Sequence, residues 1–234
     1  MEINSLHSAT LNPSQIRILN WNIQKQSNPL WRRDIRQLSC DVDLAMFQEV
    51  HLAEPFLSCF DDSWCHSFAR GYSTWNRQTG VVTLASAQHL SHQPIAICEP
   101  LIRIPKATNV TTYGLLDYER PLLVVNLHAI NFSFGINSYH LQLQQIEKIL
   151  NAHDGPVIFA GDFNAWHPKR IKLLLEFAKQ LKLLEVPFAE DFRKQVFGRH
   201  LDYVFIRDLR INDAQTQQVM SSDHNPMLAT LSVE

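Results

Sequence analysis

Acidic, amide and imidazole side chains stand at the edges of several apolar, strand-length segments of the chain. A polar residue at the end of one strand is ordinarily a cap or a turn residue, but here six segments share the feature. Residues at one end of the strands of such a sheet converge on a single crevice. We therefore expect the following side chains to lie near one another: Asn22, Glu49, His128, Asp162, Asn164, Asp202, Asp223 and His224.

These residue types together indicate metal-assisted hydrolysis of a phosphate ester. Carboxylates that meet in one crevice repel each other and carry raised pKa values, and a divalent cation relieves that repulsion. Oxygen ligands without cysteine favour a hard ion, so we expect Mg2+, with Mn2+ as the alternative. Histidines in the same crevice can donate to phosphate oxygens or transfer protons at neutral pH.

The elements that must position these residues follow from the hydrophobic pattern. Helical periodicity predicts three helices, at 31–39, from Asn137 to near Gly155, and after Pro168, which suits a first helical turn. Short β-branched and aromatic runs predict strands that are covered on both faces. We expect two sheets packed as a sandwich with helices outside. The predicted strands are 16–23, 44–47, 80–85, 122–127, 157–160, 203–206 and 227–233.

Length and composition favour one enzyme-sized domain. The chain has 234 residues, of which 45% are hydrophobic, and its formal net charge is −2. We expect one domain over 1–234, with 1–15 as a flexible N-terminal segment. The balanced charge disfavours binding of nucleic acid mainly by non-specific attraction, although a local basic rim stays open. Neither the P-loop nor the dinucleotide-binding glycine pattern occurs.

The sequence also gives an expectation for where in the cell the protein is found. The N-terminus is polar and lacks the apolar core of a signal peptide, and the longest apolar runs have only strand length. We therefore expect a cytoplasmic protein that makes no membrane contact. We also expect it to be a monomer.

Six short motifs, in order along the chain, resemble the endonuclease/exonuclease/phosphatase (DNase I-like) superfamily. They are LNWNIQ, FQEV, NLHA, GDFN, LDYVF and SDHNP. Within this superfamily the stretches WNIQKQ, NLHAINFSFG, AGDFNAW and SDHNPML look most similar to the bacterial YafD group. The resemblance implies an α/β fold, a four-layer α/β/β/α sandwich of two mainly antiparallel sheets with flanking helices.

The resemblance also implies a metal site. By its place in FQEV, Glu49 would hold Mg2+ directly. Asn22 would sit beside the ion and help to fix the site. Asp223 would contribute to the metal shell.

The catalytic roles that the resemblance implies are distributed over the later motifs. Asp162 would position or deprotonate the attacking water, and Asn164 would orient that water or a phosphate oxygen. His224 would stabilise charge on the phosphoryl oxygens, with Asp202 orienting it. His128 would donate a second hydrogen bond to the transition state.

One feature departs from the superfamily pattern. In DNase I-like members an earlier acidic residue can support the histidine of the NLH motif, but residues 63–90 contain no Asp or Glu. We expect an amide, Asn76 or Gln78, or the backbone to orient His128 instead.

Three residues beside the motifs are candidates for substrate contact. Arg199 and Lys106 could bind phosphate, and Trp166 could line the crevice. For both cations a solvated surface charge is the alternative. The basic residues Lys169, Arg170 and Lys172 are expected to form a solvated face, with a phosphate-binding rim as the alternative.

The function that these observations favour is a Mg2+-dependent phosphoesterase acting by in-line attack of water on a phosphodiester, with DNA or RNA as the expected substrate. The first alternative is a phosphatase or phosphodiesterase that acts on a small phosphorylated molecule or a phosphoinositide. The second is a non-catalytic binding domain on the same fold. The acids and imidazoles of the main motifs are all present, which favours catalysis.

Overall fold

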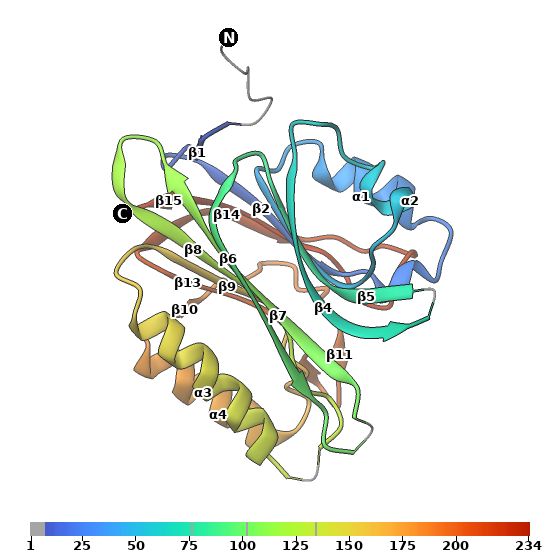
Figure 1. Ribbon diagram of the computed structural model, residues 1–234. Coiled ribbons are helices and arrows are strands. Elements are labelled where there is room, and N and C mark those ends of the chain that lie inside the picture. The colour runs from blue at the N-terminus through green and yellow to red at the C-terminus, as the bar shows by residue number, and fades with distance from the viewer. Residues whose placement is uncertain (1–7, 76, 102, 134) are drawn as a thin grey trace.

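Two β-sheets lie face to face in the computed structural model, with helices on the outer side of each (Figure 1). The structure describes residues 8–75, 77–101, 103–133 and 135–234. The helices are α1 (Trp31–Ser39), α2 (Glu54–Leu57), α3 (Asn137–Asn151) and α4 (Pro168–Gln180).

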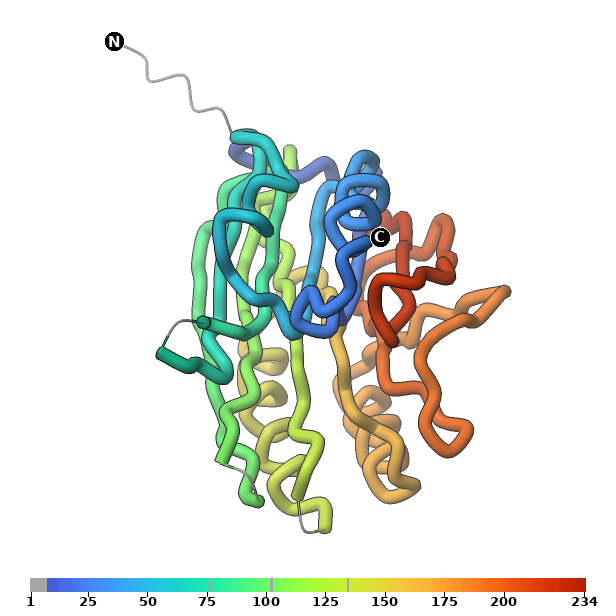
Figure 2. The backbone as a smooth tube through the Cα atoms, turned by 90° about the vertical axis from the view of Figure 1, so that its right-hand side faces the viewer, coloured from blue at the N-terminus to red at the C-terminus, as the bar shows by residue number. Residues whose placement is uncertain are grey.

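Each sheet has a defined strand order. The six-stranded sheet runs β14 (Leu209–Thr216), β15 (Met227–Val233), β2 (Ile16–Asn22), β3 (Leu44–His51), β5 (Arg77–Ala85) and β4 (Cys65–Thr74). The seven-stranded sheet runs β1 (Thr10–Leu11), β7 (Pro105–Leu115), β8 (Tyr118–His128), β9 (Val157–Asp162), β13 (Asp202–Arg207) and β10 (Leu184–Glu185), and β6 (His89–Cys98) also pairs with β7. A separate hairpin joins β11 (Gln195–Val196) to β12 (Arg199–His200). Figure 2 shows the segment between α4 and β13, coloured orange, beside the red C-terminal segment.

Three apolar layers separate the four layers of structure. Between the sheets, side chains from both inner faces pack together, among them Ile18, Met46, Val124 and Val204. The outer face of the seven-stranded sheet packs on α3 and α4, and that of the six-stranded sheet packs on α1 and α2. Burial of these faces is the main stabilising term of the fold. The architecture confirms the predicted α/β/β/α sandwich.

Strand register brings the polar residues of the seven-stranded sheet together. His128 at the end of β8 lies opposite Asp162 at the end of the parallel strand β9. Asp162 in turn lies opposite Asp202, the first residue of the antiparallel strand β13. In the facing sheet, Asn22 at the end of β2 pairs with Gln48 on β3. The strand ends therefore converge as the sequence predicted.

The predicted elements are all present, and the structure adds strands that were not predicted. The helices at 31–39, 137–151 and 168–180 and the seven apolar strands are confirmed. The strands that were not predicted include β4, β6, β7 and β14. In β6 most side chains are exposed, so the sequence lacks a continuous apolar run there. β7 buries Thr108, Asn109 and Thr111, and polar residues of this kind are more typical of a loop than of a buried strand.

Part of the N-terminal segment 1–15, which was expected to be flexible, belongs to the folded domain. Thr10 and Leu11 form β1 beside β7, and Leu11 is buried. This portion of 1–15 therefore belongs to the fold, while residues 1–7 lie outside the described part of the chain. None of the helices in the described ranges has the length and apolar character needed to span a membrane.

Gly161 is required by the close approach of β9 to β8. Its φ is +146°, and a Cβ at this position would lie 1.9 Å from the carbonyl oxygen of Leu127. We expect Gly161→Ala to lower the free energy of unfolding by at least about 3 kcal/mol, because the clash is with backbone. Gly198→Ala is the control, since φ there is +70° but no atom lies within 4 Å; we expect a loss of about 1 kcal/mol. Urea denaturation measures both, and equal losses would contradict the steric account.

Candidate active site

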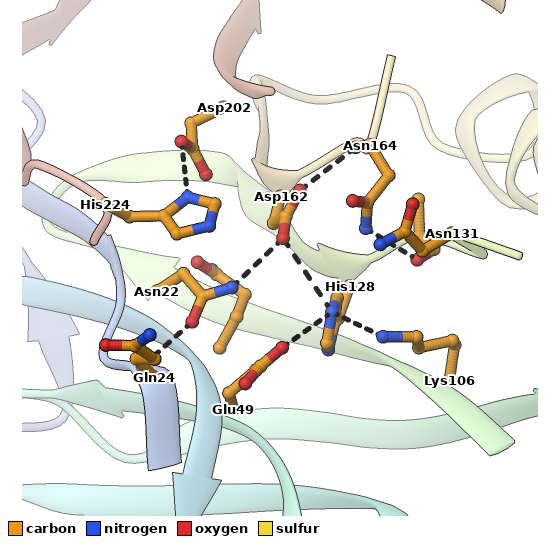
Figure 3. Close-up of polar contacts among 12 residues, drawn as sticks. Asn22, Gln24, Glu49, Lys106, His128, Asn131, Asp162, Asn164, Asp202 and His224 are labelled. Atoms are coloured by element: carbon orange, nitrogen blue, oxygen red, sulfur yellow. Dashed lines mark hydrogen bonds and ion pairs between the residues drawn. The ribbon is translucent and has the colours of Figure 1, made fainter. Parts of the chain in front are cut away.

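Asp162 stands at the centre of the polar cluster (Figure 3). Its Oδ2 accepts a hydrogen bond from Asn22 Nδ2 at 3.0 Å, which links the two sheets. Its Oδ1 accepts from the backbone N–H of Asn164, also at 3.0 Å. Burial disfavours the charged carboxylate and raises the pKa of Asp162 to about 6. The side chain is therefore held in one orientation and is basic enough to take a proton near neutral pH.

His224 and Asp202 form a buried ion pair beside Asp162. The Nδ1 atom of His224 lies 2.7 Å from Asp202 Oδ2. Burial lowers the pKa of His224, but the carboxylates of Asp202, Asp162 and Asp223 together outweigh burial and raise the pKa to about 10. The imidazolium can therefore donate from Nε2. The predicted pairing of Asp202 with His224 agrees with this geometry.

Glu49 reaches the cluster through an irregularity in its strand. The pairing of β3 with β5 shifts between Phe47 and Val50, and Glu49 has a φ of +54°. A bulge of this kind redirects a side chain, at a conformational cost of about 1–2 kcal/mol for a left-handed residue. Glu49 Oε1 thereby lies 3.5 Å from His128 Nε2.

A strained turn after β2 supports Glu49. Gln24, Lys25 and Gln26 all have φ between +46° and +56°. Gln26 binds both backbone groups of His51, donating to its oxygen at 2.9 Å and accepting from its N–H at 2.7 Å. Lys25 Nζ lies 3.6 Å from Glu49 Oε2. These residues belong to the WNIQKQ stretch, but no role was predicted for them.

His128 is oriented by a cation rather than by an amide. Lys106 Nζ lies 2.8 Å from His128 Nε2, and because a lysine ammonium can only donate, His128 accepts. Burial, followed by the charge of Lys106, lowers the pKa of His128 well below its ordinary value. This differs from the expectation that His128 donates to substrate. Gln78 is exposed and has no contact with it, and Asn76 lies outside the described residues.

Glu99 completes the group behind Lys106. Its Oε1 lies 4.0 Å from Lys106 Nζ and accepts from the backbone N–H groups of Asn131 and Phe132. Glu99 is completely buried. Thus an acid does support the NLH histidine. It is Glu99, which lies outside residues 63–90 and acts through Lys106. The motif pattern carried no signal for it.

Arg170 corrects the expectation of a solvated basic face at the start of α4. Its guanidinium is buried and donates to the carbonyl oxygens of Ile130, Asn131 and Asn164 at 2.8–3.1 Å. It therefore joins the loop after β8 to the loop after β9. The sequence did indicate this burial, because Arg170 lies four and eight residues before Leu174 and Ala178 and so shares their face of the helix, which is otherwise apolar. Lys169 and Lys172 agree with the solvated reading.

A second buried arginine supports Asp202. Arg193 pairs with Asp191 at 2.7 Å and with Glu185 at 3.1 Å, and it donates to the backbone oxygen of Asp202 at 3.2 Å. This role of Arg193 was not predicted from the sequence. Its segment has neither a motif nor a regular period.

Asn164 lies where predicted but uses its side chain locally. Its φ is +47°, a conformation that asparagine tolerates, and its Nδ2 donates to Ala129 O at 3.0 Å. The side-chain oxygen remains available to a ligand or water. Asn22 accepts from the Gln24 N–H and donates to Asp162, so it orients that acid.

The donor set fits a divalent cation. Ligand atoms of Asp162, Asp202 and His224 lie within 4.8 Å of one another, and all three residues are buried. Asp202 Oδ1 is buried without a hydrogen-bond partner in the described part of the chain. The two carboxylates face a single imidazolium, so the group keeps a negative charge when both are ionised, and a cation would neutralise that charge. Glu49 supplies a further carboxylate beside this group.

Asp223 lies at the exposed margin of the cluster. Its Oδ2 pairs with Lys194 at 3.2 Å, and its side chain is 43% exposed. Its other oxygen lies 4.0 Å from His224 Nε2. A contribution of Asp223 to the metal shell stays a prediction.

The three residues that were predicted to contact substrate lie in different places. Lys106 lies in the site. Trp166 is half-buried and donates to Asn131 Oδ1 at 2.9 Å, so it supports the wall of the site from behind. Arg199 donates to Phe197 O within the β11–β12 hairpin, and no recorded contact among the described residues joins it to the cluster.

The His224–Asp202 pair predicts how the stability of the metal-free protein depends on pH. Below about pH 6.5 its stabilisation is fully present, since imidazole is protonated in both the folded and the unfolded chain. As the pH rises towards 10, only the unfolded chain releases the proton, so the free energy of unfolding falls. We expect His224→Gln to lack this decline when melting temperature is measured against pH in EDTA. Parallel curves for the two proteins would contradict the assignment.

Comparison with known sequences places this geometry in context. The chain matches the Endonuclease/Exonuclease/phosphatase family over residues 19–224. It is 38% identical over 216 residues to a UPF0294 protein of Photorhabdus laumondii, covering 92% of this chain and 83% of that protein. It is 39% identical over 219 residues to a UPF0294 protein of Klebsiella pneumoniae, covering 93% and 82%.

Solved structures share the fold at low sequence identity. An endonuclease/exonuclease/phosphatase from Bacteroides vulgatus has a TM-score of 0.72 and 16% identity, covering 94% of this chain and 100% of that one. The human nocturnin catalytic domain with bound sulfate has a TM-score of 0.69 and 18% identity, covering 96% of each chain. ANGEL2, a 2′,3′-cyclic phosphatase in complex with adenosine-2′,3′-vanadate, has a TM-score of 0.70 and 14% identity, covering 96% and 97%.

Proposed function

Because the chain belongs to the endonuclease/exonuclease/phosphatase family, we propose that it is a Mg2+-dependent phosphoesterase that hydrolyses a phosphodiester in nucleic acid. The observation that carries the proposal is the buried group of Asp162, Asp202 and His224, with Glu49 and His128 beside it. An acid with a raised pKa, a protonated imidazole and further carboxylates at one point are the groups that phosphate-ester hydrolysis uses.

The residues of the chain have distinct tasks in the proposed mechanism. Glu49 would hold Mg2+, with Asn22 beside it; the bound ion would neutralise charge on the phosphate and lower the pKa of the attacking water. Asp162 orients the water and accepts its proton, while Asn22 and the Asn164 backbone hold the carboxylate. The competing arrangement places an ion at Asp162, Asp202 and His224. Titration of Mg2+ into Asp202→Asn protein distinguishes the two arrangements.

Hydrogen-bond donors face the developing charge from two sides. His224, kept protonated by Asp202, donates from Nε2 to a phosphoryl oxygen. Lys106 supplies the second hydrogen-bond donor that was expected of His128, and His128 fixes the ammonium in place. Donors that are positioned before the reaction stabilise the transition state without reorganisation.

The site also admits a smaller substrate. The cavity at Glu49, His128 and Lys106 has a volume of about 340 Å3, near the lower end of small-molecule sites. Hydrolysis of a small phosphorylated molecule is therefore the second candidate function. The adenosine-type vanadate ligand of ANGEL2 and the sulfate of nocturnin belong to those proteins, and they are compatible with either candidate.

A substrate panel tests the proposal. Abasic duplex, single-stranded DNA, RNA, inositol phosphates and an aryl phosphodiester would each be incubated with Mg2+ and with EDTA, and with Asp162→Ala protein as the contamination control. We expect Mg2+-dependent cleavage of a polynucleotide that the mutant lacks. Cleavage of only the small esters would favour the second candidate, and activity in EDTA or in the mutant would contradict the mechanism.

A further inference from the structure

A second cavity continues from the catalytic one along the six-stranded sheet. It has a volume of about 460 Å3 and lies between the turn Gln24–Gln26, the start of α2 and the end of the β4–β5 hairpin. It shares Lys25, Tyr72 and Thr79 with the cavity that contains Glu49 and His128. We call it the Lys25–Arg77 pocket. A group bound there would therefore adjoin the reacting phosphate.

The Lys25–Arg77 pocket has a positive charge. Lys25 and Arg77 line it, and its described lining residues include neither aspartate nor glutamate. The Lys25 side chain is 64% exposed despite its contact with Glu49. Arg77 forms no ion pair within the described ranges of the chain. A largely exposed lysine that pairs with Glu49 and an arginine without such a pair, next to a phosphoesterase centre, favour an anionic ligand.

Flat apolar surfaces form the rest of the wall. Tyr72 is 46% exposed, and Trp31 and Pro55 also face this cavity. Aromatic side chains in a positively charged groove are the groups on which unpaired bases stack. A site that bound only inorganic phosphate or a sugar phosphate would have no use for this surface.

The floor of the pocket is fixed before any ligand binds. The two hydrogen bonds between Gln26 and the His51 backbone tie the turn to β3. A rigid wall reduces the conformational entropy that binding would cost.

We propose that the Lys25–Arg77 pocket binds the base and sugar-phosphate of the unpaired nucleotide next to the scissile phosphate. The inference rests on the proposed function and narrows its substrate to single-stranded nucleic acid. A base can enter a pocket only when it has left the duplex. Arg77 and Lys25 meet the flanking phosphate, and Tyr72 and Trp31 meet the base.

Direct binding without metal tests the pocket separately from catalysis. Isothermal titration in EDTA would compare adenosine 5′-monophosphate with ribose 5-phosphate. We expect the sugar phosphate to bind at least about tenfold more weakly, because it lacks the stacked base. Tyr72→Ala and Arg77→Glu should each weaken binding of the nucleotide by about tenfold or more. Arg210→Glu is the control, since Arg210 is exposed on β14, at the opposite edge of the same sheet.

Several results would overturn the inference. One is that adenosine 5′-monophosphate does not bind even at millimolar concentration. Another is that adenosine 5′-monophosphate and ribose 5-phosphate bind equally well. A third is that Arg77→Glu protein with a native circular dichroism spectrum binds the nucleotide as tightly as the wild type. A labelled single-stranded oligonucleotide should also bind more tightly than the same sequence in a duplex, and equal binding would refute the single-strand preference.

The two proposals fail in different ways. Nucleotide binding in EDTA without turnover of any ester would preserve the pocket and refute the phosphoesterase. Hydrolysis of an aryl phosphodiester by the wild type without nucleotide binding would preserve the phosphoesterase and refute the pocket.

Discussion

Replacing Asp162 with alanine is expected to lower Mg2+-dependent turnover by at least about 100-fold, the loss typical of one transition-state group. Asp162 is the only member of the described cluster that contacts Asn22, Asn164 and, at 3.7 Å, His128. Steady-state kinetics on a cleaved substrate would measure the change.

The same variant also tests how the charge of Asp162 affects stability. Burial raises the pKa of Asp162 to about 6, so the ionised carboxylate is less favourable in the folded metal-free chain than the protonated form. In EDTA we expect the melting temperature of the wild type to rise relative to that of Asp162→Ala as the pH is lowered from 7.5 to 5, because the folded chain takes up the proton first. Asp213→Ala, at an exposed position on β14, is the matched control and should keep wild-type turnover. Near-normal turnover by Asp162→Ala would refute the mechanism.

Replacing Asp202 with asparagine is expected to lower turnover by at least about 100-fold while Mg2+ affinity changes little. The amide can no longer hold His224 as an imidazolium, and the loss of such an orienting acid is large in other His–Asp pairs. The measurements are steady-state turnover and calorimetric titration of Mg2+.

The metal titration distinguishes the two arrangements of the site. Unchanged affinity places Asp202 behind His224, as proposed. A large loss of affinity would put Asp202 in direct contact with the ion, which its unpartnered Oδ1 and the compact group with Asp162 would then explain. A further check is the pH profile, since the variant should lose activity at lower pH than the wild type as His224 deprotonates.

The sequence predicted the layers of the fold because its central strands are apolar on both faces. Runs such as 122–127 and 157–160 can only be buried between a sheet and helices or between two sheets. The outer strands were not predicted, because their apolar residues are spread among exposed ones. β6 shows this most clearly.

The site residues that were predicted correctly are those that stand at a strand end within a recognisable motif. Asp162, Asp202 and His128 converge because strand register leaves them no other position. Residues that act through long-range contacts were missed. Glu99 and Arg193 carry no local signal, since their roles come from segments that only the folded chain brings close.

Lys106 and Arg170 illustrate a more general limit. Each reads as a surface charge, because lysine and arginine are usually solvated. In the fold, the Lys106 side chain is only 13% exposed and contacts His128, while Arg170 is buried under two loops. A buried cation costs free energy unless it is paired, so its partners determine whether it can be buried. Those partners cannot be identified from sequence spacing.

The most direct test of the central claim is hydrolysis of one single-stranded oligonucleotide in H2(18)O, with Mg2+ and with EDTA. We expect one labelled oxygen on the product phosphate for each cleavage, and cleavage only when Mg2+ is present. Label on the sugar hydroxyl, or equal cleavage in EDTA, would contradict metal-dependent attack of water on phosphorus.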